Sequence, residues 1–375
     1  MSDHQQVIEK YIEEKKNAYN FLLEYIDQTD DDNNFSFVKN KLFKDPKKVN
    51  RQEIKEILEI TKNIADNHHR TQNFMQKIKE ILKTLQNEIK LFFSNEKLFE
   101  IFQNSKLILQ FLIESGMIEF TKEIFEKIRN KFELNGNRFC HFFYPEIKKL
   151  LGSENVKDIE DELLLYDPNV FDNFEAKRKS CENESYICTL IREDSVVEFI
   201  SNVNQTNTKL TIDIKPSIFE TNSFLIENKP TLIEYSAFYG SIQIFQYLMR
   251  NDVKLTPSLW LYAIHSQNAD LIHTLESNNV EKPNNDYLEC YLECIKCHHN
   301  DIAAYIENFY DLNDEARKRE EIISTVFKYH NYAYFPTKIE SSDEFFYLFC
   351  NNYIKLVNEF IKMKEPEMIS FVIQQ

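Results

Sequence analysis

Five residues able to bind a metal ion lie within ten positions of one another in the segment CYLECIKCHHND, residues 290–301. They are Cys290, Cys294, Cys297, His298 and His299. Structural zinc is held by four sulfur or nitrogen ligands in a tetrahedron, and cysteine and histidine are its usual ligands. The spacing i, i+4, i+7 places the three cysteines on one face of a helix. A zinc site is therefore the first chemistry that the sequence suggests.

The arrangement of these cysteines nevertheless favours packing over metal binding. One straight helix cannot surround an ion with four ligands, and the chain has no second Cys-x-x-Cys pair to complete the tetrahedron. A buried cysteine behaves as a small apolar residue, and Cys294 occupies a place that small residues fill elsewhere in the chain. We therefore expect no metal and no cofactor, and well under one zinc ion per purified chain.

Residues typical of a catalytic site do not stand out. Acyl-transfer enzymes place a serine or cysteine beside a base, and the pattern G-x-S-x-G is missing from the chain. The phosphate-binding patterns G-x-x-x-x-G-K-[ST] and G-x-G-x-x-G are missing too. Cys140 and His141 are adjacent, but the aromatic surroundings in RFCHFFYP favour a packing role for Cys140. We expect no enzymatic activity and no catalytic residues.

The composition predicts a helical, acidic protein. Its 375 residues include 31 Phe and 19 Tyr but only 4 Gly, and 42% of the residues are hydrophobic. So few glycines leave little scope for tight turns with positive φ, whereas the apolar content is enough for a large core. The formal net charge of −16 repels nucleic-acid phosphates and anionic membrane surfaces. We expect no nucleic-acid partner.

The expected location is the cytoplasm. No window approaches the roughly 18 uncharged apolar residues of a transmembrane helix, and the N-terminal residues lack the apolar core of a signal peptide. The seven cysteines are an odd number, and we expect them to be free thiols in a reducing compartment. We predict no membrane span.

Apolar residues recur at helical spacing along the N-terminal part of the chain. The predicted amphipathic helices here include 5–27, 52–65 and 74–93. In the third, a near-heptad stripe runs from Ile78 to Phe92 and covers about two repeats, fewer than a coiled coil needs. A polar, broken stretch at 164–185 then marks a soft boundary.

From residue 186 onward the chain repeats one pattern. Each copy begins with a small residue, has a polar or glycine turn four to six residues later, and ends in two apolar pairs. The four copies are 188–200, 236–248, 263–275 and 294–306, and their starts are 48, 27 and 31 residues apart. We interpret each copy as a helix, a tight turn and a second helix, in which the small residue lets two helices approach.

These four copies resemble ankyrin repeats, whose pattern is T-P-L-H, an alanine pair, G-H-x-E at the turn and a final L-L. Residues 231–234 stand at the T-P-L-H place, residues 236–237 at the alanine pair and residues 240–243 at the turn. In the last copy, residues 298–301 fall on G-H-x-E.

The whole chain resembles a large protist family of ankyrin-repeat proteins, expanded in trichomonad parasites, which couple a helical N-terminal region to a divergent repeat block of unknown function. Phrases such as PTLIEYSAFYGSIQIFQYL carry the resemblance over residues 181–310. It implies an all-α fold, with a helical N-terminal region followed by a divergent ankyrin-type α-solenoid. It also implies a protein-binding module or adaptor, with a partner that the sequence does not name. The irregular linkers and an insertion at 202–229 depart from regular ankyrin repeats.

We accordingly divide the chain into four parts. These are an N-terminal helical region (1–95), a helical region leading into the repeats (96–180), the divergent repeats (181–310) and C-terminal helices that cap the solenoid (311–375). The array should be stable because roughly four repeats exceed the three or so that a solenoid needs.

The resemblance also implies a binding groove, since the positions just after the small residues face the groove in ankyrin proteins. Here these positions are Phe238, Tyr239, His265, Ser266, Lys296 and Cys297. If exposed, Phe238 and Tyr239 suit a binding hot spot; the alternative is that they pack on the insertion at 202–229. A second functional hypothesis is a structural protein that assembles through its N-terminal helices, with the stripe from Ile78 to Phe92 as the contact.

Overall fold

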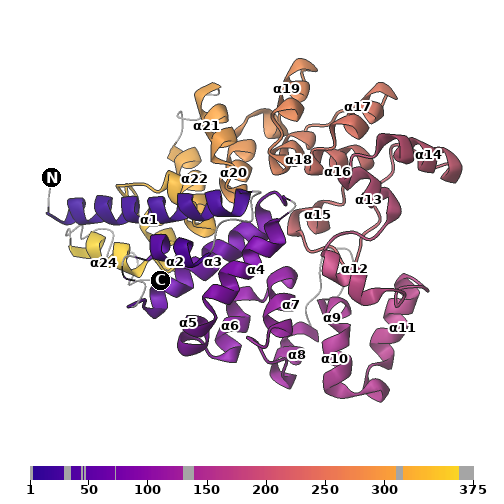
Figure 1. The fold of residues 1–375 in the computed structure, drawn as a ribbon. Helices are drawn as coiled ribbons and strands as arrows, with labels where there is room; N and C mark the ends of the chain where they lie inside the picture. The colour runs from indigo at the N-terminus through magenta and orange to yellow at the C-terminus, as the bar shows by residue number, and fades with distance from the viewer. Residues whose placement is uncertain are drawn as a thin grey trace. The chain divides into compact units, whose positions relative to one another are not determined.

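The computed structural model of the chain is built from helices (Figure 1). It describes residues 3–28, 35–43, 45, 48–71, 73–129, 139–309 and 316–362. Across these residues there is no strand, and a single isolated antiparallel bridge joins Asp213 to Thr231. The prediction of an all-α protein is therefore confirmed. Within the same residues, no helix combines the length and the apolar character needed to span a membrane.

The chain folds into two compact units, which we describe separately. Unit 1 comprises Met1–Ile64, His68–Leu85 and Lys282–Gln375, and unit 2 comprises Ala65–Asn67 and Gln86–Glu281. This division differs from the four consecutive parts expected from the sequence, because the N-terminal helices fold together with the last predicted repeat and the C-terminal helices.

The long helix α1 organises unit 1. The helices of this unit are α1 (Asp3–Asp27), α2 (Phe35–Leu42), α3 (Arg51–Asn67, with its last three residues in unit 2), α4 (Phe74–Thr84), α20 (Leu288–Cys297), α21 (Asn300–Phe309), α22 (Ala316–Tyr329), α23 (Ser342–Cys350) and α24 (Ile354–Lys362), with the 3-10 turns η3 (Pro283–Asn285) and η4 (Tyr332–Tyr334). Helix α1 packs on α2, α4, η4 and α24, so the first and the last of the described helices lie side by side (Figure 1). Its apolar stripe, including Ile8, Ile12 and Leu22, is buried as helical periodicity predicts.

The near-heptad stripe is used for packing within the chain. Its residues Ile78, Ile81 and Leu82 are buried on α4, which packs on α1 and α2. The helix is interrupted after Thr84, and Leu85 is buried as well. The stripe is therefore not the open face that the assembly hypothesis requires.

Unit 2 contains the other three predicted repeats. Its helices are α5 (Gln86–Phe92), α6 (Asn95–Phe102), α7 (Lys106–Glu114), α8 (Lys122–Arg129), α9 (Phe139–Phe142), α10 (Tyr144–Leu151), α11 (Lys157–Tyr166), α12 (Phe174–Ser180), α13 (Tyr186–Arg192), α14 (Val196–Thr206), α15 (Ser223–Asn228), α16 (Leu232–Tyr239), α17 (Ile242–Arg250), α18 (Leu259–Ser266) and α19 (Ala269–Ser277), with the 3-10 turn η2 (Ser153–Asn155).

All four predicted repeats are helix pairs: α13–α14, α16–α17 and α18–α19 in unit 2, and α20–α21 in unit 1. In unit 2, α16 packs between α13 and α18, and α14 packs on α17 (Figure 1). The first helices of the pairs thus form one layer and the second helices lie against its outer side. This arrangement explains why each copy of the pattern carries two apolar pairs.

Each helix pair turns at one residue with a left-handed backbone. These residues are Asp194 (φ 49°), Gly240 (φ 70°), Gln267 (φ 54°) and His298 (φ 61°). In three of the turns the next N–H closes the first helix by bonding back five residues: Ser195 to the Leu190 carbonyl, Ser241 to Ser236 and His299 to Cys294, at 2.9–3.0 Å. Glycine usually fills such a position because it has no Cβ. Here Asp, Gln and His fill it, so the scarcity of glycine did not prevent tight turns.

The same turn recurs beyond the predicted repeats. His330 (φ 56°) follows α22, and Asn352 (φ 62°) lies between α23 and α24. The N–H groups of Asn331 and Tyr353 bond back to the carbonyls of Val326 and Leu348. The C-terminal helices therefore continue the helix-pair pattern within unit 1.

Candidate functional site

The six residues predicted to face a groove divide between the two units. Phe238 and Tyr239 lie at the end of α16, and His265 and Ser266 lie at the end of α18, all in unit 2. Lys296 and Cys297 end α20 in unit 1. Equivalent positions in successive repeats are thus found at equivalent helix ends, as the repeat pattern predicts.

In unit 2, the predicted groove position is covered by the insertion. The ring of Phe224, on α15 in the insertion, lies with its centroid 4.1 Å from that of His265 and stacks on Phe238 at 6.1 Å with an interplanar angle of 15°. Phe238 and His265 also stack on each other at 5.0 Å. Phe238 is only 9% exposed. This packing on the insertion is the alternative that the sequence left open.

Tyr239 and Ser266 are half-buried beside this aromatic stack. The Tyr239 ring contacts the rings of Tyr235 and Phe238 at 4.8 and 5.0 Å. The Ser266 hydroxyl donates to the Ala263 carbonyl at 2.7 Å and accepts from the Asn268 N–H at 3.1 Å. Both side chains therefore also stabilise the repeat itself.

In unit 1, the cysteines of α20 are packing residues. Cys290, Cys294 and Cys297 have no exposed surface. Burial raises the pKa of all three thiols above the ordinary value. Glu289 raises the pKa of Cys290 further, Glu293 that of Cys297, and the two neighbouring thiols that of Cys294. The thiolate is the form that binds metals and attacks electrophiles, so burial disfavours the reactive form of these thiols. Lys296 pairs with Glu293 at 2.9 Å.

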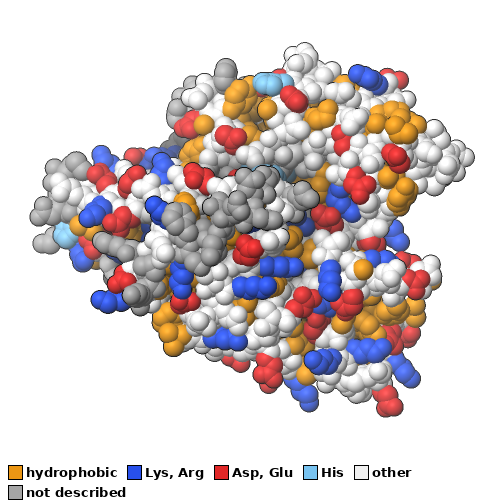
Figure 2. Space-filling view, viewed as in Figure 1, with side chains coloured by type: hydrophobic (Ala, Val, Ile, Leu, Met, Phe, Trp, Pro, Cys, Tyr) orange, Lys and Arg blue, Asp and Glu red, His pale blue; other side chains and the backbone are white. Residues whose placement is uncertain are grey.

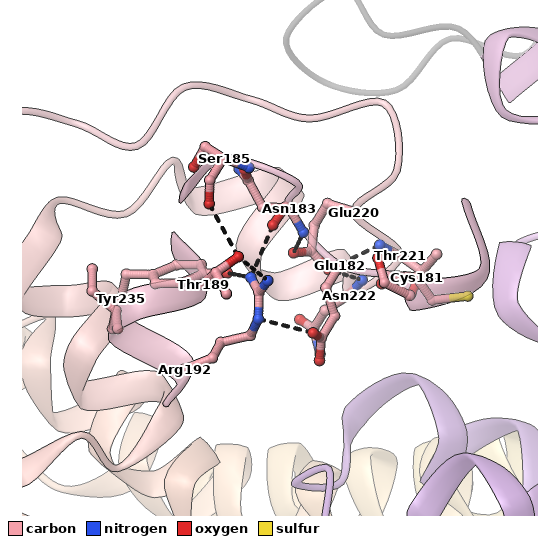
Figure 3. A network of polar contacts seen from close by, with 12 residues as sticks. Cys181, Glu182, Asn183, Ser185, Thr189, Arg192, Glu220, Thr221, Asn222 and Tyr235 are labelled. Atoms are coloured by element: carbon pink, nitrogen blue, oxygen red, sulfur yellow. Dashed lines mark hydrogen bonds and ion pairs between the residues drawn. The ribbon is translucent and has the colours of Figure 1, made fainter. Parts of the chain in front are cut away.

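A network of polar contacts joins the segments that precede α13 and α15 in unit 2 (Figure 3). The Arg192 guanidinium donates to the Asn183 carbonyl and the Tyr235 hydroxyl, each at 2.9 Å. It also pairs with Glu182 at 2.9 Å. Arginine presents five donors in a fixed fork, so one side chain joins the segment before α13 to α16.

Glu220 occupies the centre of this network and is 4% exposed. One of its oxygens accepts the N–H groups of Thr221 and Asn222 at 2.8 Å, and the other accepts the N–H of Asn183 at 3.2 Å (Figure 3). Three main-chain donors compensate the burial of this carboxylate. The network therefore fixes the insertion in place and holds Phe224 against Phe238.

A cleft of about 740 Å³ opens in unit 1 among residues of α1, α3 and α24. On its wall, Lys15 pairs with Glu56 at 2.5 Å, and the Tyr11 hydroxyl donates to the same carboxylate at 3.3 Å. Burial, followed by the charge of Glu56, raises the pKa of Tyr11. Lys15 and Tyr11 thus hold the Glu56 carboxylate in place on the wall of this cleft.

Three histidines converge elsewhere in unit 1. His68 and His69 follow α3, and His299 lies in the turn between α20 and α21. One ring nitrogen of each lies within 4.8 Å of the others. The Nδ1 of His69 is 3.3 Å from the Nε2 of His299. His68 places Nδ1 2.7 Å from the Cys297 carbonyl oxygen and Nε2 2.9 Å from Oδ1 of Asp27, the last residue of α1.

A fourth histidine, His298, lies in the turn between α20 and α21, next to His299. His298 is fully inside the protein, and its Nδ1 lies 2.6 Å from the Tyr19 hydroxyl. Burial lowers the pKa of His298 well below its ordinary value, and the nearby imidazoles of His68 and His330 lower it further. Burial also raises the pKa of Tyr19. The tyrosine therefore stays protonated and donates to a neutral imidazole.

His298 and His299 stand out in the sequence, but His68 and His69 do not; His69 meets His299 from 230 residues away in the chain. The only signal in the sequence is that the chain contains two adjacent histidine pairs, at 68–69 and 298–299. Their meeting depends on the packing of N-terminal and C-terminal helices in unit 1, which no local pattern predicts.

Comparisons with protein-family models, with curated proteins and with solved structures found no match for this chain.

Proposed function

We propose that this chain is a divergent ankyrin-type helical-repeat protein that acts as a non-enzymatic binding module for another protein. The observation that carries the proposal is the repetition itself: four helix pairs with a left-handed residue at the same place in each turn. Repeat arrays of this kind stack into extended surfaces that suit protein partners. The assignment of function from this architecture is a fold-level analogy.

The start of α16 supports the ankyrin-type assignment. The Thr231 hydroxyl accepts the Glu234 N–H at 3.4 Å, and the Glu234 carboxylate accepts the Thr231 N–H at 2.9 Å. This capping box begins the helix at the T-P-L-H place of the pattern. Glu234 also accepts a 2.5 Å hydrogen bond from Ser258, the residue before α18, and so links two repeats.

The partner surface that we propose is the outer side of α14 and α17. Val197 on α14 is 72% exposed. The same two helices also carry half-buried apolar side chains: Val196, Ile200, Ile242, Tyr247 and Met249. Figure 2 shows apolar side chains near α14 and α17, at the upper right of the view. This surface is available without displacing α15, in contrast to the position of Phe238 and His265.

We propose that the partner presents an apolar segment flanked by lysine or arginine. The exposed carboxylates of Glu193 and Glu198 lie in the α13–α14 pair, and the whole chain carries a net charge of −16. Opposite charge at the edge of an apolar contact steers association and discriminates among partners. Binding should therefore weaken as ionic strength rises.

Affinity purification of the full chain from its native cells tests this proposal. We expect wild type to recover one basic partner in a stoichiometric amount, Val197→Asp to lose it, and Leu165→Asp to retain it. Leu165 is the matched control because it is an apolar residue of unit 2 that is 91% exposed, on α11. Equal recovery of the partner with both variants would exclude the surface of α14 and α17 as the binding site. Recovery of only the chain itself would favour the assembly hypothesis.

A further inference from the structure

We propose that unit 1 binds one divalent transition-metal ion, Zn²⁺ by its ligand chemistry, through the imidazoles of His68, His69 and His299. The ligand atoms lie within 4.8 Å of one another, and all three residues belong to the same unit. Imidazole nitrogen is a preferred ligand of zinc, copper and nickel, and zinc also accepts three histidines with a fourth position open. This site shares only His299 with the five cysteine and histidine residues considered in the sequence.

The spacing of two ligand atoms fits a tetrahedral ion. Zinc–nitrogen bonds are about 2.0–2.1 Å long, so two nitrogens at tetrahedral angles lie roughly 3.3–3.4 Å apart. The Nδ1 of His69 and the Nε2 of His299 are 3.3 Å apart. The remaining nitrogen, on His68, needs only a small approach from within 4.8 Å.

The protonation of the cluster leaves lone pairs for the ion. Two neutral imidazole nitrogens that face each other cannot both carry a proton, so at least one presents a lone pair. Burial lowers the pKa of His69 below its ordinary value, and the charge of His68 lowers it further. A neutral imidazole is the form that binds metal.

The surroundings of His68 match those of a metal ligand. Ligating histidines usually donate their second N–H to a carboxylate or a main-chain carbonyl, which fixes the ring. His68 has one of each, since one nitrogen faces Asp27 and the other faces the Cys297 carbonyl. In the ion-bound form, one His68 nitrogen would exchange its oxygen contact for the ion, and the other would keep its hydrogen bond.

The location gives the ion a structural role. His68 and His69 follow α3, and His299 lies between α20 and α21. An ion at this place joins segments 230 residues apart in the chain. A bond that closes so long a loop removes conformations from the unfolded chain, and metal affinity is then added to folding stability. His69 is only half-buried and provides the route by which the ion enters.

Titration of the chelator-treated full chain with Zn²⁺, and separately with Co²⁺, tests this site. We expect one ion per chain, a rise in melting temperature with Zn²⁺, and a Co²⁺ visible spectrum of tetrahedral type without a thiolate charge-transfer band. His69→Ala and His299→Ala should each weaken binding by roughly 100-fold or more, beyond the 10- to 100-fold typical of losing an outer-shell partner. Asp27→Asn should weaken metal binding less, by about 10- to 100-fold, because Asp27 contacts a ligand and not the ion.

His273→Ala is the matched control, since His273 has a side chain that is 63% exposed and lies on α19 in unit 2. It should bind as wild type does. His69→Ala removes a half-buried side chain, so it should fold even if the change at His299 does not. Binding that is equal in His69→Ala and wild type, a thiolate band with Co²⁺, or no ion bound by wild type would each overturn the proposal.

Discussion

The Ser241 hydroxyl donates a hydrogen bond of 2.5 Å to the Ile191 carbonyl and so ties the turn of one repeat to the first helix of the repeat before it. Ser241 follows the left-handed residue Gly240, and Ile191 lies three residues before the left-handed residue Asp194. Asn331 and Ile295 stand in the same relation to His330 and His298, and their hydrogen bond is 2.9 Å. One contact between repeats thus recurs once in each unit.

The variant Ser241→Ala should destabilise unit 2 by about 1 kcal/mol, the usual net value of one buried hydrogen bond. Ser241 is 2% exposed, so water cannot replace its hydroxyl. Urea denaturation of the purified chain measures the change. Ser201→Ala on α14 is the control, because Ser201 is exposed; equal effects of the two changes would show that the bond between repeats contributes nothing.

Replacement of Arg178 should lower the free energy of unfolding by more than Ser241→Ala does. Arg178 is 1% exposed and binds both oxygens of Glu146, at 2.8 and 2.5 Å. Arg178→Met leaves this carboxylate without its partner. The free energy of unfolding should therefore fall by about 3–5 kcal/mol. Thermal and urea denaturation of the purified chain measure this loss of stability.

Two further variants distinguish the contribution of the Arg178–Glu146 ion pair from that of the packing of the Arg178 side chain. The double change Arg178→Met with Glu146→Leu should restore most of the loss, since no unpaired charge remains buried. Lys97→Met, which removes an exposed pair with Glu100, should cost less than about 1 kcal/mol. A double variant as unstable as Arg178→Met alone would contradict this assignment.

Unit 1 should lose stability in mild acid because of His298. Its folded pKa lies below the ordinary value of 6.5, so below pH 6.5 the unfolded chain binds a proton that the folded chain does not. The free energy of unfolding should therefore fall as pH decreases, by up to about 1.4 kcal/mol per pH unit from this group. His69, whose pKa is also lowered, contributes in the same direction.

The pH dependence is measured by urea denaturation at pH 7.5 and 5.5 with a chelator present. His298→Asn keeps a residue that tolerates φ of 61° and should reduce the difference between the two pH values. His273→Asn, at an exposed histidine, should leave the difference as in wild type. An unchanged difference in His298→Asn would show that His298 titrates alike in both states.

Much of the local structure could be predicted from the sequence. Apolar spacing predicted α1 and α4, and the four-copy pattern located every helix pair from α13 to α21. The resemblance of residues 298–301 to the turn at 240–243 was informative, because His298 and Gly240 both adopt a left-handed backbone. These features depend on neighbours in the chain, and a single sequence records them directly.

The long-range arrangement could not be predicted in the same way. Nothing local indicates that α1 packs on α24, so the sequence placed residues 1–95 and 311–375 in separate parts. His68 and His69 likewise meet His299 only through the folding of N-terminal and C-terminal segments into one unit. The covering of Phe238 and His265 by Phe224 also depends on a buried network around Glu220, whose partners are main-chain N–H groups. Nearly every residue has a main-chain N–H group, so these hydrogen bonds leave no recognisable pattern in the sequence.

The binding energy of the proposed partner surface should concentrate at Val197. Val197→Asp places a charge in an apolar contact, and loss of a hot-spot residue costs about 2 kcal/mol, or roughly 30-fold in Kd. Titration of the recovered partner by calorimetry measures this change, with Leu165→Asp as the reference. An effect below about threefold at Val197 would exclude it as a hot spot.

The most direct measurement of the central claim is site-specific photo-crosslinking in the native cell, with a photoreactive amino acid at position 197. We predict that one protein partner is captured at this position and that none is captured when the same group is placed at position 165. Crosslinks of equal yield at both positions, or no protein captured at position 197, would contradict a binding role for the repeat surface.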